Sequence, residues 1–123
     1  MRLIIDASEV IHWLRTGDDL LEDVDGVIST VTIGELFVGD IAQKDGKQRE
    51  SILEVLKGWK QISPRLETAI LAGELRYKYR LALGDAFVAA LALEENLPLA
   101  TLDSGDFKKI KGLKLYQLSS GLR

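Results

Sequence analysis

Short apolar runs alternate with amphipathic segments along the chain. The runs at residues 3–5, 26–29, 97–101 and 114–118 are rich in Leu, Ile, Val or Ala and are too short for helices, so we predict strands there. A short edge strand is a further candidate at residues 60–63. Strand candidates are therefore distributed over the whole chain.

Between these runs, apolar residues recur every three or four positions, which predicts helices. The predicted helices cover residues 8–15, 32–42, 48–57, 67–79 and 85–95, with a brief helical turn at 107–110. Strands and helices that alternate along one chain indicate an α/β fold with a mainly parallel sheet and helices on both faces. No repeat and no linker interrupts the pattern, so we expect residues 1–123 to form a single domain.

The composition excludes several kinds of site. Without cysteine the chain has no disulfide, no zinc–thiolate centre and no thiol nucleophile, and a cytoplasmic location is the simplest expectation. His12 is the single histidine, so oxygen ligands dominate and favour Mg²⁺ or Mn²⁺ over zinc. The net charge of −3 is unlike the basic surface of proteins that hold nucleic acid by charge alone. We expect neither a signal peptide nor a membrane span, because Asp6 interrupts the first apolar run and no later run is long enough.

Four acidic residues are expected at one edge of the sheet. Asp6 follows the first strand directly, Glu35 lies about one turn into the helix after the second strand, and Asp103 follows the third strand. Asp85 begins the helix that leads into the third strand, and a helix antiparallel to the strand that it precedes starts at the same carboxyl end. Ligand sites of parallel sheets lie beyond the carboxyl ends of the strands. These acids are therefore predicted to meet.

A cluster of carboxylates requires a cation. Carboxylates that crowd together raise one another's pKa unless a positive charge neutralises them. Mg²⁺ accepts carboxylate, water and phosphate oxygens as ligands. One or two such ions activate water and stabilise the departing oxygen in phosphodiester hydrolysis. The acids therefore predict metal-dependent cleavage of a nucleic acid.

Each acid also has a purely structural explanation. Residues 6–9 and 32–35 both match the spacing of a helix capping box. Asp85 at a helix start is favoured by the helix dipole whatever its function, and residues 103–106 are typical of a turn with a cap. Caps do not explain why four acids fall at equivalent ends of the sheet, but for any one residue both explanations remain open.

Four segments together resemble those of the PIN-domain family, particularly the VapC-type toxin ribonucleases. In chain order they are LIIDAS at residues 3–8, STVTIGEL at 29–36, GDAFVAALAL at 84–93 and LATLDSGDF at 99–107. The likeness extends from residue 3 to about residue 118. It implies a three-layer α/β/α fold and a metal-dependent endoribonuclease that hydrolyses RNA phosphodiester bonds, as the toxin of a VapBC-type toxin–antitoxin pair.

The resemblance implies roles for particular acids. The catalytic metal ligands for Mg²⁺ or Mn²⁺ would be Asp6, Glu35, Asp85 and Asp103, with Asp106 as a further ligand nearby. Family members differ over Asp or Asn at the position of Asp103. Either Asp103 or Asp106 is therefore the principal fourth acid.

Other residues near these acids have both a functional and a structural interpretation. Ser8 and Thr101 match positions that orient the site in the family, yet either hydroxyl could be an ordinary cap or strand-end group. Lys108 and Lys109 could contact an RNA backbone or could form a solvated face. Gly84 departs from the Ser or Thr often found before the acid in similar proteins, which we expect to affect local hydrogen bonding more than metal binding.

The resemblance also implies partners. RNA would be the substrate, a VapB-like antitoxin would lie in a groove near the helices at 32–42 and 48–57, and the chain would form a homodimer. Two alternatives remain. One is a non-catalytic PIN-fold module that binds RNA or protein, against which the intact acids count. The other is phosphotransfer on a receiver-like or dehalogenase-like fold, but residues 6–8 lack the second aspartate of the dehalogenase signature.

Overall fold

A parallel β-sheet forms the middle layer of the structure, a computed structural model that describes residues 1–17, 21 and 23–118. The strand order is β3-β2-β1-β4-β5, and every neighbouring pair is parallel. The strands are β1 (Arg2–Ile5), β2 (Asp25–Ser29), β3 (Lys60–Ile62), β4 (Leu99–Ala100) and β5 (Leu115–Tyr116). The predicted α/β fold with a mainly parallel sheet is confirmed, including the short edge strand β3.

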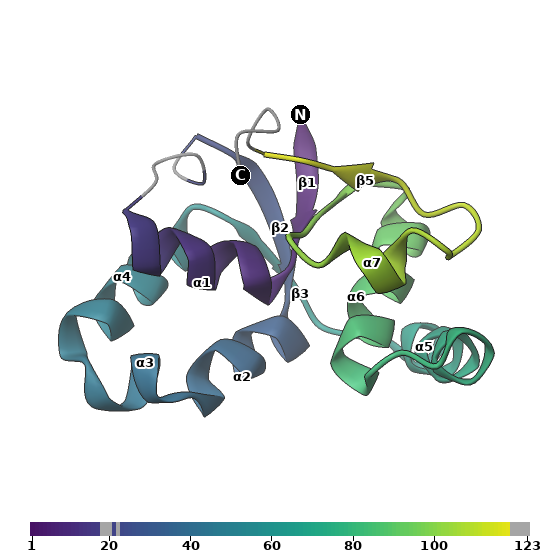
Figure 1. The fold of residues 1–123 in the computed structure, drawn as a ribbon, viewed down its shortest axis with the longest axis horizontal. Helices are drawn as coiled ribbons and strands as arrows, with labels where there is room; N and C mark the ends of the chain where they lie inside the picture. Colours follow the sequence, from purple (N-terminus) through teal and green to yellow (C-terminus); the bar gives the residue numbers. More distant parts are fainter. Residues whose placement is uncertain (18–20, 22, 119–123) are drawn as a thin grey trace.

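Helices cover both faces of this sheet (Figure 1). One face is covered by α1 (Ala7–Thr16), α2 (Thr30–Val38), α3 (Asp40–Lys44) and α4 (Gly46–Lys57). The other face is covered by α5 (Leu66–Tyr79), α6 (Leu83–Glu95) and α7 (Ser104–Phe107). The predicted three-layer α/β/α architecture is therefore confirmed.

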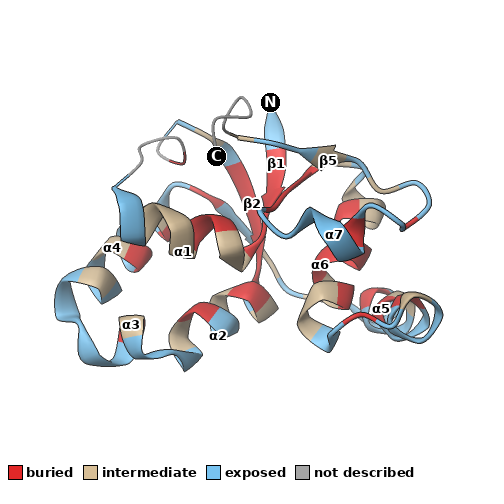
Figure 2. Cartoon of the chain, in the orientation of Figure 1, coloured by how far each residue is buried: buried red, intermediate tan, exposed pale blue. Residues whose placement is uncertain are grey.

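Strand β1 directs its side chains alternately into the two outer layers. Ile4 packs in the apolar cluster with α5, α6 and α7, whereas Leu3 and Ile5 pack with α1, α2 and α4. All three side chains are buried. A continuous apolar run is expected for a parallel strand that is covered on both faces, because successive side chains point to opposite sides. Figure 2 shows the same distribution, with burial concentrated along the sheet and on the helix faces turned toward it.

Helix α6 is the most deeply buried helix of its layer. Its short alanine side chains allow close packing against the sheet and α5. The buried residues of the helix are Ala86, Val88, Ala89, Ala90, Leu91 and Ala92. Even so, none of the helices in the described part of the chain has the length and apolar character needed to cross a membrane.

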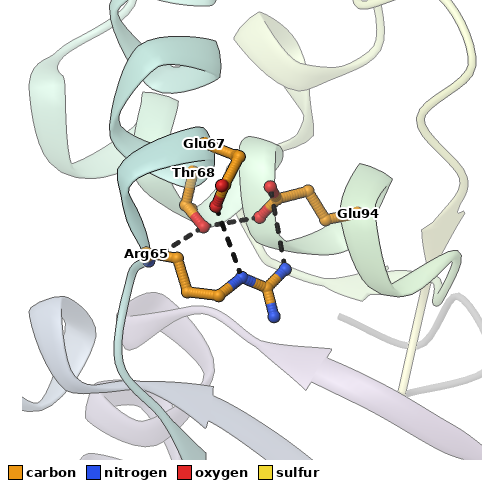
Figure 3. A network of polar contacts seen from close by, with 4 residues as sticks. All are labelled: Arg65, Glu67, Thr68 and Glu94. Carbon is orange, nitrogen blue, oxygen red and sulfur yellow. Dashed lines mark hydrogen bonds and ion pairs between the residues drawn. The ribbon is translucent and has the colours of Figure 1, made fainter.

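A polar network fastens the start of α5 to the end of α6 (Figure 3). Thr68 Oγ1 donates to Glu94 Oε1 at 2.7 Å and accepts a hydrogen bond of 3.1 Å from the backbone N–H of Arg65. The Arg65 guanidinium also lies 3.9 Å from the Glu94 carboxylate and 3.8 Å from that of Glu67. Thr68 is buried, so its hydroxyl needs these partners. The network holds in place the helix whose first turn carries Asp85.

The single helix predicted over residues 32–42 is wrong in its extent. Helix α2 begins earlier, at Thr30, because Ser29 Oγ accepts a hydrogen bond of 3.1 Å from the Val31 N–H and caps the helix. At Gly39 the chain is extended, with ψ at 171°, and this residue separates α2 from α3. The low helix propensity of glycine favours a break at that position.

Two predicted elements near the C-terminal end differ from the structure, one in length and one in position. Strand β4 covers two residues rather than 97–101, because the Leu97 N–H donates to Ala92 O at the end of α6 and Pro98 has no N–H to donate. The helical turn predicted at 107–110 is the helix α7, three residues earlier. The chain therefore re-enters helical geometry almost directly after β4.

Removing the Ser29 hydroxyl should loosen the helix that carries Glu35. In Ser29→Ala the Val31 N–H loses its cap, and we expect the free energy of unfolding to fall by about 1 kcal/mol, as for other cap deletions. Urea unfolding followed by circular dichroism measures this change. Ser63→Ala removes an exposed hydroxyl whose hydrogen bond from Thr30 Oγ1 is long, at 3.4 Å, and therefore weak, and it should cost less than about 0.5 kcal/mol. Equal stability of the two variants would contradict the capping role.

Candidate active site

Acidic side chains from separate elements converge at the carboxyl end of the sheet. Asp6 follows β1, Glu35 lies in α2, and Asp85 lies in the first turn of α6. Burial, followed by repulsion from Asp6 and Asp85, raises the pKa of Glu35. Burial also comes first for Asp85, whose pKa is raised from 3.8 to about 6, followed by repulsion from Asp6, Asp103 and Asp106. Solvent and salt screen the repulsion between distant charges. The coupling between these carboxylates therefore indicates that the predicted acids are neighbours.

The register of the sheet fixes Asp6 beside Thr101. Ile5 of β1 pairs with Ala100 of β4, and the Asp6 N–H donates to Ala100 O at 3.0 Å. Asp6 and Thr101, which follow this pair in the two parallel strands, therefore lie side by side. The hydroxyls of Thr101 and Ser8 each donate to Asp6 Oδ2 at 2.7 Å. Asp6 is only 6% exposed, so these hydrogen bonds hold a buried carboxylate in one orientation.

The loop after β4 directs both hydroxyl protons toward Asp6. The Leu102 N–H donates to Ser8 Oγ at 3.0 Å, and the Asp103 N–H donates to Thr101 Oγ1 at 3.0 Å. Each hydroxyl has a single proton, so a hydroxyl that accepts from the loop can still donate to the carboxylate. Both donate to Oδ2, and in the described part of the chain Asp6 Oδ1 accepts no hydrogen bond. One carboxylate oxygen is therefore held, and the other is open to a ligand.

Hydrogen bonds decide most of the capping explanations that the sequence left open. The side chains of Asp6 and Asp103 make no cap hydrogen bond, although each precedes a helix. Helix α2 is capped by Ser29, so the capping box at residues 32–35 is wrong. Asp85 does lie in the first turn of α6, where the helix dipole favours a negative charge. Asp85 therefore has a structural role at the start of α6 and is also coupled electrostatically to the other acids.

The segment after β4 carries the remaining predicted site residues. Asp103, Asp106, Lys108 and Lys109 are all exposed. Lys109 Nζ lies 3.6 Å from Asp106 Oδ1, which offsets part of the charge of that carboxylate. Asp103 has the larger effect of the two acids on the pKa of Asp85. Of the two candidates for the fourth acid, Asp103 is therefore the more strongly coupled to Asp85.

The carboxylates fit a hard divalent cation better than a closed metal centre. No three His, Cys, Asp or Glu side chains within the described ranges stand together as a preassembled metal site. Mg²⁺ does not require one, because it keeps several waters and binds through one or two carboxylates together with substrate phosphate. Burial and then repulsion between neighbouring acids raise the pKa values of Glu35 and Asp85, and a cation would relieve both effects. Asp6 supplies an open oxygen, since both hydroxyls donate to its Oδ2. The donor set is thus suited to Mg²⁺ or Mn²⁺.

Comparison with known families agrees with this arrangement. The sequence matches the PIN domain over residues 3–113. The chain belongs to the PIN-domain family. The receiver-like and dehalogenase-like folds considered as alternatives are therefore excluded.

Several proteins are similar to this PIN-domain chain over most of their length. The plasmid stability protein StbB of Pseudomonas syringae pv. tomato is 33% identical, covering 82% of this chain and 78% of the relative. Ribonuclease VapC of Rickettsia bellii is 29% identical, covering 94% of this chain and 95% of the relative. A chain in the structure of a toxin–antitoxin complex from Klebsiella pneumoniae is 26% identical with a TM-score of 0.74, covering 94% of this chain and 98% of that one.

One contact in this PIN-domain site is not predicted by the sequence analysis. The Glu35 carboxylate lies against the Cα of Gly84, in the space that a side chain at position 84 would occupy. A signal is present in the sequence, since a glycine directly precedes an acid at the start of a helix, where glycine lowers helix stability. That signal does not identify the partner, because Glu35 comes from a distant segment.

The crowded carboxylates predict a pH-dependent stability for the metal-free protein. The pKa of Asp85 is higher in the folded state than its ordinary value, so its contribution favours folding at low pH and is lost as the pH rises through about 6. In EDTA at pH 7.5, Asp85→Asn should therefore melt at a higher temperature than the wild type. The difference should shrink as the pH falls toward 5.

Thermal unfolding followed by circular dichroism at several pH values measures this difference. Glu74→Gln removes an exposed carboxylate of α5 and is the matched control, for which we expect no comparable change. A lower melting temperature for Asp85→Asn at pH 7.5 in EDTA would show that the ionised carboxylate stabilises the fold, contrary to this account.

Proposed function

We propose that this PIN-domain chain is a metal-dependent endoribonuclease that acts as the toxin of a VapBC-type pair. The observation that carries the proposal is the convergence of Asp6, Glu35 and Asp85, whose carboxylates couple electrostatically at the carboxyl end of the sheet. Two comparisons support it. A relative similar over nearly its whole length is named Ribonuclease VapC, and a solved structure of similar fold is a toxin–antitoxin complex.

In this proposal the metal ion is Mg²⁺ or Mn²⁺. Its ligands are drawn from Asp6, Glu35, Asp85 and Asp103, with Asp106 as an additional acid. When bound, the ion activates water and stabilises negative charge on the phosphodiester that is hydrolysed. Its binding requires deprotonated carboxylates, and the pKa of Asp85, at about 6, leaves that group mostly ionised at neutral pH.

The chain's own residues position these acids. Ser8 and Thr101 hold Asp6 through Oδ2 and so keep Oδ1 directed away from the hydroxyls. The Thr101 hydroxyl also accepts from the Asp103 N–H, which ties the start of the following acidic loop to Asp6. A site held to within a fraction of an ångström is what metal-assisted hydrolysis requires. Ser8 and Thr101 are therefore proposed as site-orienting residues.

RNA is the proposed substrate, and Lys108 and Lys109 are proposed to contact its backbone. Both lysines are exposed next to the acidic loop. The ion pair of Lys109 with Asp106 is exposed as well, with half or more of each side chain accessible, and such surface pairs contribute little free energy. Lys109 can therefore exchange this contact for a phosphate. The mild net negative charge of the chain means that phosphate binding must be local.

A VapB-like antitoxin is the proposed protein partner. An apolar pocket of about 300 Å³ opens beside Glu35, between α1, α2, α3 and α4. Its apolar lining residues are Ile11, Leu14, Leu36, Ile41 and Ile52. A segment that fills this pocket can bring a basic side chain to the acids, which would inhibit the site. The single-domain organisation of residues 1–123, the homodimer and the cytoplasmic location stay predictions.

Cleavage of a mixed RNA pool tests the proposed activity. We expect cutting with Mg²⁺ or Mn²⁺ and none in EDTA. Asp6→Asn and Asp85→Asn should each lower the rate at least about 100-fold, because even residues that only support a metal ligand contribute up to that factor. The rate of fragment appearance on a denaturing gel gives the comparison.

Glu74→Gln serves again as the folded control and should cut RNA at the wild-type rate. RNA binding without metal-dependent cutting, in protein of verified fold, would instead identify the non-catalytic binding module. Cutting that survives both aspartate substitutions would assign the activity to another site.

A further inference from the structure

Gly84 has a helical backbone that does not require glycine. It is the second residue of α6, and its φ angle is not positive, unlike those of Gly17 and Gly112. Glycine in a helix is less stable than alanine because of its greater freedom in the unfolded chain. The local backbone therefore gives no reason for glycine at this position.

The space beside Gly84 is occupied by the carboxylate of Glu35. A Cβ atom built on Gly84 would overlap Glu35 Oε2 and would lie 2.9 Å from Cδ and 3.2 Å from Oε1. Its three nearest neighbours all belong to that one carboxylate. By contrast, a Cβ at Gly73 or Gly105, two other helical glycines, would meet nothing within 4 Å. The atoms nearest to the space beside Gly84 thus all belong to one group of the site.

This contact lies where α2 and α6 bring their acids together. Glu35 is an exposed residue, so its carboxylate could turn into solvent if nothing held it in place. In its observed place it lies over the first turn of α6, next to Asp85, where the helix dipole favours negative charge. Any side chain at position 84 would displace the carboxylate from this place.

We propose that Gly84 is a positioning residue, which leaves open the space in which the Glu35 carboxylate is held beside Asp85. The proposal rests on the proposed function, in that Glu35 serves as a ligand of the divalent cation. It differs from the expectation that the glycine before Asp85 affects local hydrogen bonding more than metal binding. Glycine matters at this position because the Glu35 carboxylate occupies the volume that a side chain would fill.

The proposal predicts opposite effects on folding and on metal binding. The atoms that a new methyl group would meet are the end of a flexible side chain, which can move away at little cost. Gly84→Ala should therefore keep or raise the melting temperature in EDTA, by up to about 4 °C from helix propensity. The dissociation constant for Mn²⁺ should rise at least about tenfold, as for other residues that orient a ligand.

Calorimetric titration with Mn²⁺ and thermal unfolding in EDTA test this prediction on the whole chain. Gly73→Ala is the matched control, since it makes the same substitution in a helix where the added methyl meets open space. It should stabilise the protein to a similar extent and leave Mn²⁺ affinity unchanged. This control separates the effect of helix propensity from the effect on Glu35.

A double-mutant cycle with Glu35→Gln tests whether Gly84 acts through Glu35. If it does, Gly84→Ala should weaken Mn²⁺ binding in the wild type and have no further effect in the Glu35→Gln protein. An unchanged affinity of Gly84→Ala, or an equal loss in both backgrounds, would overturn the proposal while leaving the metal site intact. Absence of Mn²⁺ binding by the wild type itself would instead overturn the proposed function, and this inference with it.

Discussion

Repulsion among partly buried carboxylates is the unfavourable interaction that the rest of this fold must overcome. Asp6, Glu35 and Asp85 come from the end of a strand and from two different helices, and each is coupled to another by an unfavourable interaction. The dipole of α6 favours a negative charge at its first turn, but it does not remove the repulsion between the acids that meet there. The approach is maintained by apolar packing on both faces of the sheet, which is large and insensitive to charge.

The sheet also determines which atoms of the acids are accessible. Alternation of Leu3, Ile4 and Ile5 between the two apolar clusters fixes the register of β1, because a slip by one residue would reverse every buried side chain. That register places Asp6 next to Thr101, whose hydroxyl takes one carboxylate oxygen. The hydrophobic pattern of β1 thus determines, through the register and these hydrogen bonds, that Oδ1 is the oxygen of Asp6 that remains open.

The fold and the convergence of the acids could be predicted from the sequence because both depend on periodicity and topology. Asp6 follows an apolar strand, and parallel strands end at one edge, so its location requires no knowledge of packing. The end of α2 at Gly39, the cap at Ser29 and the seat of Glu35 on Gly84 could not be predicted in this way. In each case several local structures are compatible with the sequence, and tertiary contacts decide which one forms.

The same repulsion links binding at the site to folding. Anything that binds only the folded protein stabilises it by mass action, and a positive charge at the acids does so by relieving an interaction that opposes folding. A divalent cation and a basic side chain of a partner relieve the same repulsion, so under the proposed function they compete for one site. The apolar pocket beside Glu35 offers a surface for the partner's neighbouring side chains, and a cation gains nothing from that surface. Under the proposed function, an antitoxin would therefore gain affinity from the pocket while its charge replaces the metal.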